Sequence, residues 1–89
     1  MDRTKTPKQT GGYESADLEG EFMLYHSQLA KALYLNETAS LIWKLCDGTR
    51  SVGAIEGLLR DAYPDAPDLT RDVDDAFKTL IDHGVLELS

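Results

Sequence analysis

The sequence predicts an α+β domain with a winged helix-turn-helix-like arrangement, in which a three-stranded antiparallel sheet precedes three helices (βββααα). Residues 21–25 and 31–35 are short runs rich in apolar and aromatic residues, as in strands; Phe22 and Leu24 would lie on one face of the first run, opposite Met23 and Tyr25. Beyond residue 36, apolar residues recur every three or four positions in three segments, which is the spacing of amphipathic helices. The last two segments are joined by the short, turn-rich loop 65–68, which favours a helix-turn-helix pair.

Three short strands are expected before the helices, over residues 14–18, 21–25 and 31–35. The first is weak, and we place it at an edge of the sheet. Glu19-Gly20 is read as the turn between the first two strands. Alternation places Leu33 and Leu35 on one face of the third strand, opposite Tyr34. The short connections predict an antiparallel meander.

The first helix follows the third strand directly, in the run LNETASLIWKLCDG over residues 35–48. Asn36 is a preferred N-cap residue. Asp47-Gly48 ends the helix, since glycine accepts the left-handed conformation after a C-terminus. The apolar stripe of this helix comprises Ala39, Ile42, Trp43 and Cys46. We expect Trp43 to belong to the core rather than to a partner groove.

Two further helices complete the predicted domain. Ser51 caps the second, whose apolar stripe comprises Val52, Ile55, Leu58, Leu59 and Ala62. Asp68 or Thr70 caps the third, and His83-Gly84 ends it. The stripe of the third helix comprises Leu69, Val73, Ala76, Phe77 and Leu80. Residues 85–88 form a short extended tail.

The chain of 89 residues is expected to form one domain over residues 13–89, preceded by a disordered tail over residues 1–12 that is rich in polar residues and glycine. It has no apolar run long enough to cross a membrane and no apolar segment typical of a secretory signal. With a single cysteine, it fits a cytoplasmic protein without an internal disulfide.

Charge argues against a nucleic-acid partner. The formal net charge is −7, of which the first twelve residues carry +2 and the remainder −9. Nucleic-acid binding depends on Lys and Arg that neutralise phosphates. An acidic body instead fits a basic partner, or one bound mainly through backbone and apolar contacts.

The ionisable residues form no recognisable catalytic or metal site. His26 and His83 lie far apart in the sequence, and Cys46 lies on an apolar stripe, so a zinc site is not expected. No nucleophile elbow, dinucleotide fingerprint or P-loop is present, and we expect neither an enzyme nor a cofactor. Five aspartates lie between residues 65 and 75, and we interpret them mainly as solvent-exposed residues at the start of a helix, where the helix dipole favours negative charge. The alternative is an acidic rim that attracts a basic peptide.

The third strand carries the functional hypothesis. If residues 31–35 lie at an edge of the sheet, their unpaired N–H and C=O groups can pair with another chain unless part of the protein covers them. The tail 85–88 or a loop can cover them, or a partner peptide can add as a further strand. The added peptide would lie in a groove between the third strand and the third helix. The apolar stripe of that helix would contact both the core and the peptide.

Several motifs in order resemble the PqqD family over residues 15–88. They are Tyr34-Leu35-Asn36, Thr38-Ala39, Ile42-Trp43, Asp47-Gly48, Asp72-Val73, Leu80 and Gly84-Val85-Leu86. Members of this family are RiPP recognition elements, which bind the leader of a ribosomally made precursor peptide and present it to a modifying enzyme. In PQQ biosynthesis that enzyme is a radical SAM protein.

The resemblance implies a non-catalytic peptide chaperone whose leader peptide adds beside the third strand and packs on the third helix. The implied peptide-binding residues are Lys31, Ala32, Leu33, Tyr34, Leu35, Asp72, Val73, Asp75, Ala76, Phe77, Thr79 and Leu80. The chain would be a monomer or a weak strand-swapped homodimer.

The rival hypothesis is a winged-helix DNA-binding regulator, which shares the helix-turn-helix arrangement. Its recognition helix should offer Arg, Lys, Asn or Gln to base edges. The third helix instead carries four aspartates against Arg71 and Lys78 only.

Overall fold

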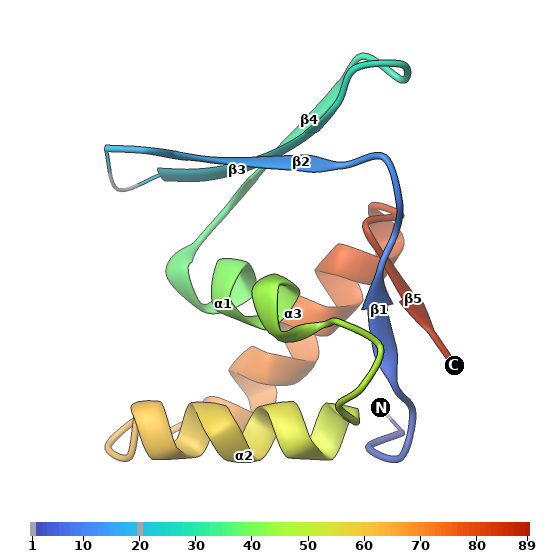
Figure 1. Cartoon of the computed structure of the whole chain (residues 1–89). Helices are drawn as coiled ribbons and strands as arrows, with labels where there is room; N and C mark the ends of the chain where they lie inside the picture. Colours follow the sequence, from blue (N-terminus) through green and yellow to red (C-terminus); the bar gives the residue numbers. More distant parts are fainter. Residues whose placement is uncertain (1, 20) are drawn as a thin grey trace.

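Strands and helices follow one another as predicted, with one additional strand at each end of the chain (Figure 1). A computed structural model describes residues 2–19 and 21–89. Within these residues the elements are β1 (Pro7–Gln9), β2 (Glu14–Leu18), β3 (Glu21–His26), β4 (Lys31–Leu35), α1 (Glu37–Leu45), α2 (Val52–Ala62), α3 (Leu69–Asp82) and β5 (Leu86–Leu88). The predicted α+β class is confirmed.

The three-stranded sheet is the predicted antiparallel meander, in the order β2-β3-β4. It forms a layer above the helices (Figure 1). Phe22 pairs with Leu35 and Leu24 with Leu33, so these four side chains share one face of the sheet. Phe22, Leu24 and Leu35 are buried on that face. The predicted turn at Glu19-Gly20 lies partly outside the described residues.

Helix ends follow the predicted capping chemistry. The Asn36 side chain accepts a hydrogen bond of 2.8 Å from the Ala39 amide, and Ser51 Oγ accepts one of 3.1 Å from the Ala54 amide. Helix α1 ends at Leu45, and Gly48 takes a positive φ of 85° shortly after it. Asp68 is the N-cap of α3 but makes no side-chain capping hydrogen bond.

The C-terminus of α3 turns sharply into β5. Gly84 has a φ of 73°, its amide donates to the Ile81 carbonyl, and the Val85 amide donates to the Leu80 carbonyl. This is the Schellman pattern, in which glycine takes the left-handed position. Val85 and Leu80 are both fully buried, so the turn also seals the core.

The N-terminal segment differs from the prediction. Residues 7–9 form β1, which pairs antiparallel with β5, and Pro7 is buried. Arg3 Nη2 donates to Glu56 Oε1 at 2.7 Å and to Asp74 Oδ1 at 3.3 Å. The expectation of a disordered tail over residues 1–12 is therefore wrong for the described residues of that segment, because a distant strand and two helices supply its partners. Met1 lies outside the described residues.

The core lies between the sheet and the helices and uses the predicted stripes. All stripe residues of α1 and α3 are buried, as are Val52, Ile55 and Leu59 of α2. Leu58 is 44% exposed and Ala62 is also exposed, so the predicted stripe of α2 is too wide. Trp43 is buried, as predicted, and its Nε1 donates to the Val85 carbonyl at 3.1 Å. No helix among the described residues is long and apolar enough to cross a membrane.

Candidate functional site

Strand β4 is an edge strand with an unoccupied side. In the order β2-β3-β4, β4 pairs only with β3. The C-terminal strand β5 pairs with β1, so it does not cover β4. Within residues 2–19 and 21–89, no strand or loop backbone hydrogen-bonds to the free edge of β4. Its unpaired N–H and C=O groups are therefore available to another extended chain.

A groove of about 410 Å³ lies beside the C-terminal end of β4. Its floor and one side come from the β4–α1 junction, and its opposite wall comes from α3. The residues lining it are Tyr34, Leu35, Asn36, Thr38, Ala39, Asp72, Asp75, Ala76 and Thr79. The four α3 residues recur at i, i+3, i+4 and i+7, so they form one stripe beside the buried stripe of the same helix.

Six of the predicted peptide-binding residues line this groove. They are Tyr34, Leu35, Asp72, Asp75, Ala76 and Thr79. Lys31, Ala32 and Leu33 belong to β4 but lie beyond the groove, nearer the hairpin.

The other three predicted residues lie in the core. Val73, Phe77 and Leu80 have no exposed surface. A peptide cannot touch these side chains unless the core repacks, so they support the α3 wall from behind. Ala76 lies between the two stripes, because it lines the groove and is only 9% exposed.

Three groove residues were not predicted: Asn36, Thr38 and Ala39. The sequence does contain a signal for them, since the helix N-cap follows β4 without a loop. The first turn of α1 must then lie beside the end of the strand. In the sequence, Asn36 is assigned as a helix cap and as part of a family motif, but not as a groove residue.

The charge on the groove is negative. Asp72 and Asp75 are its only charged lining residues, and both are exposed. Among the described residues neither has an ion-pair partner, whereas the neighbouring Asp74 pairs with Arg3. An adjoining hollow of about 530 Å³ shares Tyr34, Leu35 and Asn36 with the groove and adds Glu21.

The hairpin end of β4 is bridged to α3. Lys31 Nζ donates a hydrogen bond to the carbonyl oxygen of His83, the C-cap residue of α3. A cation at a helix C-terminus is stabilised by the helix dipole. This contact ties the start of β4 to the end of α3, so the strand and helix run in opposite directions along the groove.

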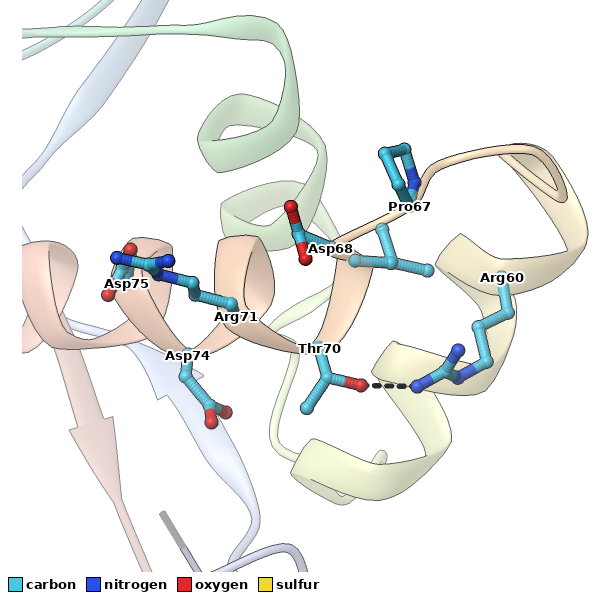
Figure 2. A pocket seen from close by; sticks show the side chains of 8 residues that line it. Arg60, Pro67, Asp68, Thr70, Arg71, Asp74 and Asp75 are labelled. Atoms are coloured by element: carbon cyan, nitrogen blue, oxygen red, sulfur yellow. Dashed lines mark hydrogen bonds between the residues drawn. The ribbon is translucent and has the colours of Figure 1, made fainter.

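A second hollow, of about 490 Å³, lies at the N-terminus of α3 (Figure 2). Arg60 of α2 points across it and donates to Thr70 Oγ1 of α3. Its lining also includes Arg71, Asp68 and Asp74, so both charge signs are present. No residue of β4 lines it, and it offers no free strand edge.

Among the described residues, the possible metal ligands do not cluster and the cysteine is buried. No group of three or more His, Cys, Asp and Glu side chains among them could hold a metal ion. Cys46 is fully buried, and its Sγ lies 3.0 Å from the Ile42 carbonyl oxygen. Burial raises the pKa of the Cys46 thiol to about 12, with a smaller contribution from Asp47. The thiol is therefore protonated near neutral pH.

Sequence comparison identifies relatives over most of the chain. The family model described as "Coenzyme PQQ synthesis protein D (PqqD)" matches residues 21–86. A protein of Pseudomonas syringae pv. tomato named "PqqA binding protein" is 40% identical over 80 residues, which cover 85% of this chain and 78% of the relative. A Klebsiella pneumoniae protein of the same name is 37% identical over 76 residues, covering 82% and 79%.

Structural comparison gives a consistent result. The solved structure "TbiB1 in Complex with the TbiA(beta) Leader Peptide" superposes with a TM-score of 0.72 at 26% identity, covering 90% of this chain and 94% of TbiB1. Together with the family model and the relatives, it confirms the resemblance inferred from the motifs, and the chain belongs to the PqqD family.

Proposed function

We propose that this protein is a non-catalytic peptide chaperone that binds the leader of a ribosomally synthesised precursor peptide. The observation that carries the proposal is the free edge of β4 beside the groove between β4 and α3. An extended leader would pair with β4 through its backbone, while its side chains on one face enter the groove. The relatives named PqqA binding protein and the TbiB1 complex support a peptide ligand of this kind.

The size of the site suits a reversible interaction. Strand β4 has five residues, so an added strand gains few backbone hydrogen bonds. A free leader is disordered, and ordering it on binding costs conformational entropy. We therefore expect micromolar rather than subnanomolar affinity, which is useful for a peptide that must later be released.

The leader would be handed to a modifying enzyme, for which we propose a radical SAM protein in PQQ or related RiPP biosynthesis. The family description names coenzyme PQQ synthesis, which supports the pathway in this proposal. We propose a cytoplasmic location, where precursor peptides are made, and a monomer or weak strand-swapped dimer. The free edge of β4 would serve the leader in the monomer.

DNA binding by a winged helix-turn-helix is the weaker alternative. The exposed residues of α3 include Asp72, Asp75 and Asp82, which repel phosphates. The comparisons supply peptide-binding relatives and no reason to favour a nucleic acid.

Titration calorimetry with a synthetic PqqA precursor, and separately with the TbiA(β) leader, tests the proposal. Tyr34→Ala should weaken binding about fivefold or more, because Tyr34 is 64% exposed and lines the groove. Leu29→Ala is the matched control, since Leu29 is 62% exposed but lies in the β3–β4 loop outside the groove. Binding of neither peptide by folded protein, or equal losses in both variants, would contradict the proposal.

A further inference from the structure

Strand β4 and helix α3 differ in charge from one end to the other, with Lys31 beyond the groove and the two aspartates inside it. Lys31 starts β4 and contacts the C-terminus of α3, whereas Tyr34 and Leu35 end β4 beside Asp72 and Asp75. Four residue steps of a strand span about 13 Å, and the eleven steps from residue 72 to residue 83 of a helix span about 16 Å. Strand and helix therefore run side by side over a similar length, with a cation at one end and carboxylates at the other.

Neither carboxylate at the acidic end forms a salt bridge within the part of the chain that the structure describes, although Arg71 and Asp75 line the same neighbouring hollow (Figure 2). Asp72 lies in the first turn of α3, where the helix dipole favours negative charge. Asp75 lies beyond that turn and faces Asp72 across an i, i+3 spacing, which is unfavourable for like charges. No Lys or Arg among the described residues pairs with either, and Glu21 adds a third carboxylate in the adjoining hollow.

We infer that the groove selects a leader segment that carries a Lys or Arg side chain at the position lying against Asp72 and Asp75. This inference rests on the proposed function, and it specifies the ligand by charge and register. In an added strand, alternate side chains point toward the same wall. A basic side chain at the matching position relieves the repulsion between the two aspartates, whereas an acidic one adds to it. In a different register the basic side chain would lie beside Lys31 instead, where like charges repel, so that register is disfavoured.

A charge scan of the peptide tests the inference. The probe is the PqqA precursor, carrying a single Lys at each successive position and, in a second series, a single Glu. With the wild-type protein, Lys at one position should tighten binding about two- to fivefold, and Glu there should weaken it by a similar factor. The effect should shrink at high ionic strength.

Protein variants separate a groove contact from a general charge effect. In Asp72→Asn/Asp75→Asn the preference for Lys at that position should disappear. Asp61→Asn/Asp65→Asn is the matched control, because it removes the same charge from exposed residues outside the groove. A flat scan, or equal losses in both double variants, overturns the inference while leaving peptide binding intact. No binding of any peptide overturns the proposed function and this inference together.

Discussion

At the scale of single residues, Trp43 connects the helical core to the C-terminal strand. Its ring is buried, and Nε1 donates to the Val85 carbonyl at 3.1 Å. The Val85 carbonyl also accepts a hydrogen bond from the Thr10 amide, so Trp43→Phe removes one of its two hydrogen bonds. Because the substitution also removes buried ring volume, we expect a loss of about 1–3 kcal/mol in the free energy of unfolding. Urea denaturation measures it.

The matched control for Trp43 is Tyr63→Phe. The Tyr63 hydroxyl makes an exposed hydrogen bond of 3.0 Å to Glu37, so its removal should change stability by less than about 0.5 kcal/mol. If Trp43→Phe were as mild as this control, the link between α1 and the start of β5 would not contribute to stability.

Cys46 should behave as a structural side chain. Its thiol is buried, and burial raises its pKa to about 12. We expect no reaction with a thiol reagent at pH 8 in the folded protein and rapid reaction in concentrated urea. Since an unfolded thiol ionises near pH 8.5, this group stabilises the fold fully below that pH and progressively less as the pH rises toward 12. Rapid labelling of folded protein would contradict the burial.

Residue-level prediction from sequence identified the core better than the site. The spacing in α3 correctly gave the buried stripe Leu69, Val73, Ala76, Phe77 and Leu80. The groove stripe lies one position away on the same helix, at Asp72, Asp75, Ala76 and Thr79. Periodicity alone does not say where a buried face ends. The sequence therefore could not separate the residues that line the groove from those that support them from the core.

At the scale of elements, β1 is the strand that the sequence did not predict. It has three residues, begins with proline and shows no alternation, and its partner β5 lies at the other end of the chain. Its stability comes from tertiary contacts: Pro7 is buried, and Gln9 Nε2 donates to the Trp43 carbonyl at 2.9 Å. Such nonlocal pairing leaves no local signal in the sequence.

Deleting residues 1–9 should therefore destabilise the domain by more than about 1 kcal/mol, because the deletion exposes β5 and the core beside Pro7. Thermal or urea unfolding measures the effect, and deleting residues 1 and 2 alone provides the control. Unchanged stability after the longer deletion would mean that β1 contributes nothing to the fold.

Helix α2 is tied to the N-terminal segment by an ion pair that should be sensitive to acid. The hydrogen bond from Arg3 lowers the pKa of Glu56. A carboxylate with a lowered folded-state pKa contributes stability above its unfolded pKa of about 4.3 and loses it as the pH falls through the folded value. In Glu56→Gln the melting temperature should therefore fall less between about pH 5 and pH 3 than it does in the wild-type protein. If the melting temperature of the wild type and of Glu56→Gln fell equally with pH, the Arg3–Glu56 pair would not contribute to stability.

At the scale of the whole molecule, the pairing of β5 with β1 accounts for the open site. The sequence predicted the sheet, the three helices and an extended tail, and left undecided whether that tail covers the third strand. In the folded chain the tail pairs with β1 and leaves the edge of β4 free beside α3. The N-terminal segment thus pairs with the C-terminal strand in a separate two-stranded sheet, and neither strand pairs with β4.

The net charge of −7 agrees with this arrangement. An acidic surface around an acidic groove attracts basic peptides and repels nucleic acids. The charge was evident from composition. The position of two carboxylates in the groove was not evident, because it depends on the fold. Asp74 of α3 pairs with Arg3, whereas Asp72 and Asp75 line the groove and have no ion-pair partner among the described residues.

The most direct test of the central claim is an NMR structure of the backbone pairing in the complex with the PqqA precursor. We predict interstrand contacts between peptide amides and residues of β4, slowed hydrogen exchange at alternate β4 amides, and shift changes at Asp72, Asp75 and Thr79. A bound peptide that leaves the β4 amides unchanged and perturbs only α2 or the outer strand β2 would contradict strand addition at this edge.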